Sequence, residues 1–341
     1  MKVAVIGTGS WGTALAKVLA ENHHQVMMWG RDLDVIDEIN QAHRNHRYLG
    51  QTVLPEALVA SGDLEEVVKD AEAVLFVLPT AAMRSVASQV NQVLEKLGQA
   101  PIIIHATKGL EPGSHARMSQ VLDQVIQPQN RAAVVVLSGP SHAEEVARQD
   151  LTTITAASGN LAAAKVVQDL FMNHFFRVYT NQDVIGVELG AALKNIIALG
   201  AGALVGLGYG DNAKAGLVTR GLAEISRMGV HLGADPLTFL GLSGVGDLVV
   251  TCTSPHSRNW QAGRLLALGY NRMEIQNKID MVVEGVSTTQ VAYELAQAEA
   301  VDMPITQAIY RALYEGVRVE DAIADLMARE GKQEAATDQG L

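Results

Sequence analysis

Short runs of β-branched and aliphatic residues alternate with longer amphipathic stretches through the first half of the chain. Several runs, such as VLFVL and VVVL, are apolar at consecutive positions, as in strands that helices cover on both faces. Strands that alternate with helical patterns indicate crossover units and a mostly parallel sheet. The runs predicted as strands are residues 2–6, 25–29, 73–78, 102–106, 132–137, 152–156 and 175–179.

From about residue 181 onward the pattern changes, because stretches with helical periodicity follow one another without intervening strands. The clearest cover residues 184–204, 213–232, 260–268 and 288–298. We therefore predict an α/β protein in which a Rossmann-type, doubly wound sheet (residues 1–181) precedes an all-α domain (residues 182–330). Residues 331–341 carry no apolar periodicity and are predicted to form a disordered tail.

Composition narrows the classes of function. The 341 residues suffice for two cores, and the formal net charge of -11 argues against nucleic acid as a partner, because binding to phosphates depends on Lys and Arg. The single cysteine, Cys252, excludes an intramolecular disulfide and favours a reducing compartment, so a cytoplasmic protein is expected. The longest weakly charged stretch, residues 195–210, is shorter than the ~20 apolar residues that cross a bilayer, so no membrane span is expected.

A glycine-rich motif, GTGSWG, lies directly after the first predicted strand and before a helical pattern. Its first glycine, Gly7, permits a tight turn, Gly9 lets the backbone approach a pyrophosphate, and Gly12 allows close packing of the helix. The N-terminus of that helix would face the phosphates. This context predicts dinucleotide binding, and the alternative is a glycine-rich turn without a ligand.

The end of the second predicted strand bears on the choice of nicotinamide cofactor. An NAD-selective site carries an acidic residue there, which binds the ribose hydroxyls. Here Arg31 follows the strand and Asp32 follows Arg31. Because a planar guanidinium suits a ribose 2′-phosphate, NADP(H) is favoured, while Asp32 is compatible with NAD(H). In the alternative, Arg31 is a solvated surface residue.

Two further strand ends carry polar residues, and the ligands of such sheets lie beyond the carboxyl ends of the strands. Lys108 follows the strand at 102–106, where a cation would reach both cofactor and substrate; a lysine in a surface loop is the alternative. After the next strand, Ser141 and Glu144 have the spacing of a capping box. That spacing predicts a helix whose N-terminal amides point into the same crevice.

The helix predicted at 184–204 holds a lysine in apolar surroundings. Lys194 has Leu193, Ile196 and Ile197 as neighbours. A lysine there is costly unless it is paired or used, and desolvation lowers its pKa toward values that suit acid–base catalysis. We therefore favour a catalytic lysine over one whose ammonium group extends to the surface.

A third polar cluster lies in GDLVVTCTSPHSRN. Asp247 follows a glycine-rich turn, and Ser257, Arg258 and Asn259 precede a helix predicted to begin near residue 260. A hydroxyl, a guanidinium and an amide at a helix N-terminus match a phosphate site. Simple capping of that helix by Ser257 or Asn259 is the alternative. The ten histidines show no metal-binding spacing, so no metal is expected.

Motifs along almost the whole chain resemble those of one family, the soluble NAD(P)-dependent glycerol-3-phosphate dehydrogenases of bacterial type. Their order and approximate spacing also match, and together they are far more specific than one glycine-rich loop. The motifs are GTGSWGTA, ATKGLE, SGPSHAEEV, GVELGAALKNIIALGAG, GDLVVTCTSPHSRN, VVEGVSTT and MPITQAIY. One departure is His142, which stands where relatives often carry phenylalanine.

The resemblance implies roles for the residues that match. It implies that Lys194 transfers the proton and that Lys108 and Asp247 assist in catalysis. Substrate contacts are implied for Lys108, Gly139, Ser141, Lys194, Asp247, Ser257, Arg258 and Asn259. Cofactor contacts are implied for Ser10, Trp11, Arg31, Lys108, Ala143, Arg258, Val282 and Glu284, beside the motif glycines Gly7, Gly9 and Gly12.

The implied reaction is reversible hydride transfer between NAD(P)H and the carbonyl of dihydroxyacetone phosphate, which gives sn-glycerol 3-phosphate, the backbone precursor of phospholipids. Two alternatives stay open. One is a 3-hydroxyacid dehydrogenase of the phosphogluconate type, which also joins a Rossmann domain to a helical domain with a Lys-Asn pair; the other is a dinucleotide-binding sensor without turnover. The Gly- and Ala-rich helix at 184–204 is compatible with an intrachain core or with a homodimer contact.

Overall fold

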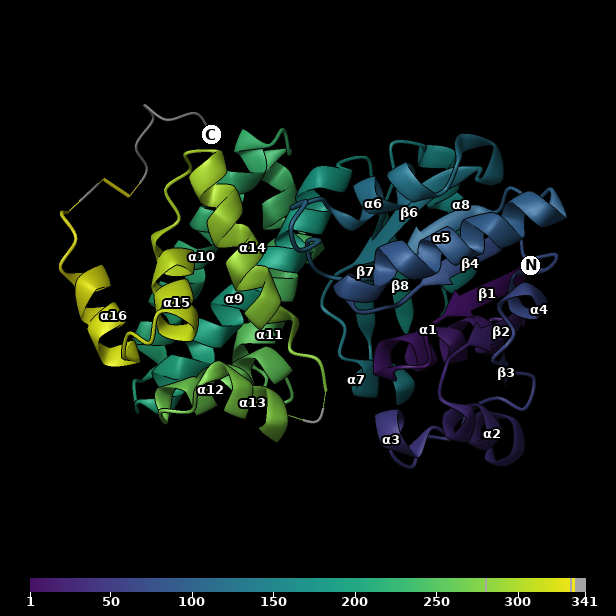
Figure 1. Ribbon diagram of the computed structural model, residues 1–341, viewed down its shortest axis with the longest axis horizontal. Coiled ribbons are helices and arrows are strands. Elements are labelled where there is room, and N and C mark those ends of the chain that lie inside the picture. The colour runs from purple at the N-terminus through teal and green to yellow at the C-terminus, as the bar shows by residue number, and fades with distance from the viewer. Residues whose placement is uncertain (280, 332, 335–341) are drawn as a thin grey trace. The chain divides into compact units, whose positions relative to one another are not determined.

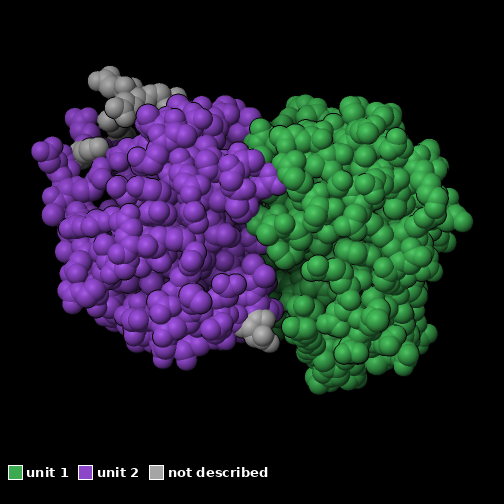
Figure 2. All heavy atoms as spheres, viewed as in Figure 1, with its two compact units in different colours: residues 1–107, 116–184 green, residues 108–115, 185–341 purple. Residues whose placement is uncertain are grey.

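The runs predicted as strands lie in one part of the chain, which alternates strands and helices (Figure 1). The computed structural model describes residues 1–279, 281–331 and 333–334. It divides into a first unit, Met1–Thr107 with Ala116–Val184, and a second unit, Lys108–His115 with the chain from Ile185 onward (Figure 2). Of the predicted tail, residues 332 and 335–341 lie outside the described residues.

Every strand predicted in the first unit is present, with ends that differ by two residues at most. The three-residue strand β3 was not predicted, because VAS is too short to show a pattern. The elements are β1 (Lys2–Ile6), α1 (Ser10–Glu21), β2 (Gln25–Trp29), α2 (Leu33–Ala42), α3 (His46–Leu49), β3 (Val59–Ser61), α4 (Leu64–Val68), β4 (Ala73–Phe76), α5 (Thr80–Leu97), β5 (Ile102–His105), α6 (Met118–Val125), η1 (Pro128–Asn130), β6 (Ala133–Ser138), α7 (Ala143–Ala147), β7 (Thr152–Ala157), α8 (Leu161–Phe171) and β8 (Phe176–Asn181).

These strands form one sheet in the order β3-β2-β1-β4-β5-β6-β7-β8. All neighbouring pairs are parallel except β6 and β7, which are antiparallel. The order of the first six strands is that of a doubly wound dinucleotide-binding sheet. The predicted fold class of this half is therefore confirmed.

Helices cover both faces of the sheet, as the apolar strands indicate. In β1, Val3 and Val5 belong to a core cluster that includes residues of α1 and α8, whereas Ala4 and Ile6 belong to another that includes residues of α5 and α6. Successive side chains of a strand point to opposite faces. All four side chains are fully buried. The residues that face either side of the sheet are therefore apolar, which explains the uninterrupted apolar run.

Every element named in the second unit is a helix, which confirms the predicted all-α half. Its central helix, α9, is long and apolar enough to cross a membrane by length and composition, but 83% of its apolar window is buried inside the protein. A core helix gives the same signal. The elements are α9 (Val184–Gly206), α10 (Asp211–His231), η2 (Pro236–Leu240), η3 (Leu242–Gly246), α11 (Asp247–Thr253), α12 (Arg258–Ala267), α13 (Arg272–Lys278), α14 (Glu284–Ala298), α15 (Pro304–Tyr314) and α16 (Val319–Met327).

Candidate active site

The glycine motif forms the turn between β1 and α1 in the first unit. Gly7 has a φ of +127°, and a Cβ there would lie 2.3 Å from the carbonyl oxygen of Val77; a Cβ on Gly12 would lie 2.2 Å from the carbonyl oxygen of Gly7. A Cβ on Gly9, in contrast, would meet nothing within 4 Å, and no side chain caps α1. Open space in front of uncapped helix amides fits the pyrophosphate of a dinucleotide.

The other cofactor candidates of the first unit lie at the starts of helices and after β2. Ser10 and Trp11 open α1, with Ser10 buried and Trp11 packed against the sheet core. Ala143 is buried at the start of α7. Arg31 is exposed and lies two residues beyond the end of β2. Asp32 is the N-cap of α2, and its carboxylate accepts hydrogen bonds from two backbone N–H groups of that helix.

The predicted capping box of Ser141 and Glu144 is wrong. Helix α7 has only five residues, its N-cap is His142, and no side chain caps it. Ser141 Oγ instead donates to the carbonyl oxygen of Gly139 over 2.9 Å. The helix therefore begins one residue later than the capping box requires.

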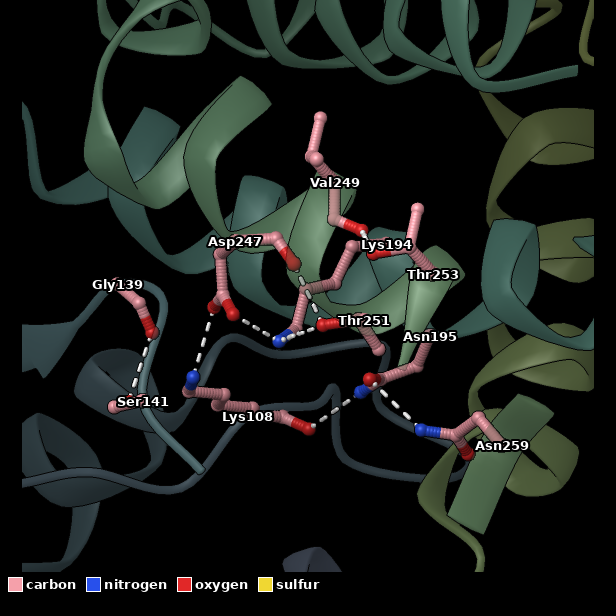
Figure 3. Close-up of polar contacts among 10 residues, drawn as sticks. All are labelled: Lys108, Gly139, Ser141, Lys194, Asn195, Asp247, Val249, Thr251, Thr253 and Asn259. Carbon is pink, nitrogen blue, oxygen red and sulfur yellow. Dashed lines mark hydrogen bonds and ion pairs between the residues drawn. The ribbon is translucent and has the colours of Figure 1, made fainter. Parts of the chain in front are cut away.

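Three predicted catalytic residues meet in the second unit. Lys194 Nζ donates to Asp247 Oδ1, and Lys108 Nζ donates to Asp247 Oδ2 over 2.8 Å (Figure 3). Lys194 Nζ also donates to Thr251 Oγ1 over 2.7 Å, and that hydroxyl donates to the carbonyl oxygen of Asp247 over 2.6 Å. The side chains of Asp247 and Lys194 are 1% and 6% exposed, against 18% for Lys108. One carboxylate thus holds two ammonium groups in a nearly dry site.

Burial and charge shift the pKa values of this cluster in ways that suit proton transfer. Burial lowers the pKa of Lys194 to about 7, against the carboxylate of Asp247, which raises it, while the charge of Lys108 lowers it further. Burial alone would raise the pKa of Asp247, but the neighbouring charges of Lys108 and Lys194 lower it below its ordinary value. Lys194 can therefore both give and accept a proton near neutral pH, while Asp247 stays ionised.

Close backbone packing explains how distant residues reach one another here. Gly190 lies one turn before Lys194 in α9, and a Cβ on Gly190 would lie 2.4 Å from the carbonyl oxygen of Ser243. The turn η3 therefore approaches α9 where no side chain separates them. Asp247 follows that turn as the first residue of α11, which brings its carboxylate to Lys194.

An amide relay joins the lysine cluster to α12 and α14. Asn195 Nδ2 donates to the carbonyl oxygen of Lys108 over 3.5 Å, and Asn259 Nδ2 donates to Asn195 Oδ1 over 2.9 Å (Figure 3). Asn259 Oδ1 in turn accepts from the backbone N–H of Gly285 over 2.8 Å. Thr251 was not predicted as a site residue, although its i, i+4 spacing from Asp247 was a visible signal.

The remaining candidates of the second unit surround the start of α12. Ser257 is the N-cap and accepts from the backbone N–H of Trp260 over 3.3 Å. Arg258 Nη1 donates to the carbonyl oxygen of Val282 over 3.0 Å. Val282 is half-exposed and Glu284 is the first residue of α14. The structure therefore shows helix capping by Ser257 and brings Arg258 to the 282–284 segment.

Two other kinds of site would be a metal centre and a nucleophilic cysteine. Among the described residues no group of three His, Cys, Asp or Glu side chains is arranged to hold a metal ion. Burial raises the pKa of Cys252 to about 12. A buried thiol of that kind is a core residue and not a nucleophile.

Comparison with known families gives the same assignment as the motifs. Residues 2–164 match the family model of the NAD-dependent glycerol-3-phosphate dehydrogenase N-terminus, and residues 183–324 match that of the C-terminus. The chain belongs to this family. The resemblance inferred from the motifs is thereby confirmed, as are the oxidoreductase class and the use of NAD(P).

Individual relatives are similar to this chain over nearly their full length. The glycerol-3-phosphate dehydrogenase (NAD(P)+) of Enterococcus faecalis is 62% identical, over 98% of this chain and 97% of its own. That of Lactiplantibacillus plantarum is 58% identical, over 98% of both chains. The crystal structure of glycerol-3-phosphate dehydrogenase from Coxiella burnetii has a TM-score of 0.90 at 37% identity and covers 96% of this chain and 98% of its own.

Proposed function

We propose that this protein catalyses the reversible NAD(P)H-dependent reduction of dihydroxyacetone phosphate to sn-glycerol 3-phosphate, which supplies the glycerophospholipid backbone. The observation that carries the proposal is the buried Lys194 ammonium, held by Asp247 and Thr251 with a pKa lowered to about 7. Such a group is matched to proton exchange with a carbonyl or alcohol oxygen at neutral pH. Membership of the glycerol-3-phosphate dehydrogenase family identifies dihydroxyacetone phosphate as the carbonyl substrate.

Each member of the lysine cluster has a distinct task in the proposed reaction. The nicotinamide supplies the hydride when the cofactor is bound. Lys194 donates a proton to the carbonyl oxygen during reduction and recovers one from the alcohol during oxidation. Asp247 keeps the Lys194 ammonium in position, and Lys108, the more exposed of the two lysines, polarises the carbonyl.

The substrate phosphate is assigned to the start of α12. Ser257, Arg258 and Asn259 lie there together with the N-terminal amides of a ten-residue helix, and this combination favours a dianion. Gly139 and Ser141 complete the proposed substrate contacts. Binding energy from the phosphate, remote from the carbonyl, would fix the orientation of the reacting atoms.

The cofactor contacts divide between the two halves of the chain. Residues 1–181 are proposed as the dinucleotide-binding domain, and residues 182–330 as the substrate domain. In the first, the contacts come from Gly7, Gly9, Ser10, Trp11, Gly12, Arg31 and Ala143. Lys108, Arg258, Val282 and Glu284, which cluster with the second unit, supply the others.

The cytoplasm is the proposed compartment, since the substrates are small phosphorylated metabolites and a single cysteine needs no oxidising environment. Burial of α9 favours an intrachain core over a homodimer contact for that helix. Sedimentation velocity on the purified chain would determine the number of subunits.

The decisive experiment follows NADPH absorbance after addition of dihydroxyacetone phosphate. A parallel panel contains unphosphorylated dihydroxyacetone and, for the reverse direction, 3-hydroxyacids with NADP+. We expect rapid oxidation with the phosphorylated ketone and little turnover of the others. Preference for a 3-hydroxyacid would assign the phosphogluconate-type reaction, and cofactor binding without turnover of any substrate would indicate a sensor.

A further inference from the structure

A second arginine, Arg47, lies near the carboxyl end of β2, where it contacts Asp32, the residue after Arg31. Arg47 Nη1 donates to Asp32 Oδ2 over 3.2 Å, and the Arg47 guanidinium lies over the ring of Tyr48, 5.5 Å from its centroid. The Arg47 side chain is 56% exposed. Asp32 is thus flanked by Arg31 in sequence and by Arg47 through a contact between α3 and the start of α2.

The contact changes what Asp32 can do. Its Oδ1 accepts from the backbone N–H groups of Asp34 and Val35, and its Oδ2 accepts from Arg47. A carboxylate used in this way is poorly placed to accept a ribose hydroxyl. The three side chains Arg31, Asp32 and Arg47 carry a net charge of plus one, whereas Arg31 and Asp32 alone would be neutral. An added anion is therefore favoured at this end of the strand.

The position of Arg47 is tied to the glycine loop through a buried amide two residues earlier. Asn45 is fully buried, and its Nδ2 donates to the carbonyl oxygen of Thr8 and to Thr13 Oγ1, both over 2.9 Å. Thr8 lies between Gly7 and Gly9 of the proposed pyrophosphate loop. The segment that carries Arg47 is therefore held against that loop, so little order has to be gained when a nucleotide binds.

We propose that Arg47 is a second determinant of NADP(H) selectivity, which binds the ribose 2′-phosphate together with Arg31 while its ion pair keeps Asp32 from opposing that phosphate. The inference rests on the proposed NADP(H) site of the first unit. Arg47 has five N–H donors, of which Nη1 is the one that bonds to Asp32. The planar guanidinium can thus bond to phosphate oxygens without releasing the carboxylate. NAD(H), which lacks the 2′-phosphate, gains nothing from this arrangement.

Binding measurements test the inference without turnover. Calorimetric titration of the full chain with NADP+ and with NAD+ gives the two dissociation constants. For Arg47→Gln we expect the Kd of NADP+ to rise about tenfold or more, as for loss of a charge-assisted hydrogen bond, and that of NAD+ to change less than about twofold. Arg31→Ala should act in the same direction.

A matched control is available in the same unit. Arg148 is 63% exposed and forms an ion pair with Asp150 at 3.2 Å, so it equals Arg47 in residue type and pairing distance and is similarly exposed. Arg148→Gln should leave both dissociation constants unchanged. Equal weakening of NADP+ and NAD+ by Arg47→Gln would make Arg47 a structural residue and overturn the inference, as would unchanged NADP+ binding.

The Asp32→Asn background separates direct contact from simple neutralisation. If Arg47 binds the 2′-phosphate, Arg47→Gln weakens NADP+ binding in that background as well. If the effect of Arg47→Gln disappears there, Arg47 acts only by neutralising Asp32, and the direct contact is refuted. A wild-type chain that reduces dihydroxyacetone phosphate while Arg47→Gln keeps its NADP+ affinity would refute this inference alone. A chain that binds NADP+ selectively but does not reduce the ketone would refute the proposed reaction instead.

Discussion

Replacement of Asp247 by asparagine tests how the buried cluster sets the protonation of Lys194. The change keeps the shape of the side chain and removes one negative charge. The Asp247 carboxylate accepts hydrogen bonds from both Lys194 and Lys108, and the side chain is 1% exposed. Its attraction raises the pKa of Lys194 against the effect of burial. Without it, the Lys194 ammonium should lose its proton more readily.

The size of the effect follows from the position of that pKa. At a pKa of about 7, half of Lys194 is charged at neutral pH. Loss of an opposite charge at hydrogen-bond distance lowers a pKa by about 1–3, and a further drop of ~2 would leave about 1% charged near pH 7. The parameter kcat/KM reports the protonation of the free enzyme. We therefore expect kcat/KM for ketone reduction to fall ~50-fold near pH 7, where the variant keeps about 1% of Lys194 charged, but only ~2-fold near pH 5, where about half stays charged.

The assay is the initial rate of NADPH oxidation by dihydroxyacetone phosphate, measured for both proteins from about pH 5 to pH 8 with blanks for acid decay of NADPH. Asp325→Asn is the control, since Asp325 pairs with Arg311 on the surface of the same unit at 2.8 Å. Its ratio to wild type should be near one at every pH. A loss for Asp247→Asn that is equally large at all pH values, in a protein that melts normally, would refute an effect through the Lys194 pKa and leave Asp247 a positioning role only.

Three further outcomes are expected. Lys194→Ala should lower kcat by about 10²–10⁴-fold while NADPH affinity and the thermal melt stay near wild type; a folded variant that keeps more than about a tenth of kcat would remove Lys194 from the acid role. At saturating NADPH, which removes the proposed cofactor contact of Arg258 from the comparison, Arg258→Ala should lower kcat/KM for the phosphorylated ketone by about 10–100-fold but not that for dihydroxyacetone; equal losses for both ketones would contradict a phosphate contact. Burial raises the pKa of Glu224 to about 8 from an ordinary 4.5, against the N–H groups of Ile305 and Thr306. The folded state thus retains a proton that the unfolded chain releases, so wild-type stability should fall relative to Glu224→Gln as the pH rises between those values. A constant difference in Tm between the two proteins would contradict this.

Local patterns in the sequence were sufficient for the architecture and for the first candidate residues, whereas the resemblance to a family supplied the remaining ones. Strands buried on both faces leave uninterrupted apolar runs, and helices leave a 3.6-residue period, so both halves of the fold could be predicted. The glycine motif was readable because a turn against backbone tolerates no side chain at Gly7 or Gly12. Lys194 was readable because a charge among apolar helix residues needs a reason.

Tertiary structure decided the contacts among these residues. Lys194 and Asp247 are 53 positions apart, and Lys108 and Asp247 are 139 apart. Their meeting depends on the close approach of a turn to Gly190 and on the segment Lys108–His115, which clusters with the second unit. The pairing of Arg47 with Asp32, 15 positions apart, has the same origin. The partner of a side chain depends on distances in the folded chain. Spacing along the sequence predicts only contacts between residues within a turn or two of one helix.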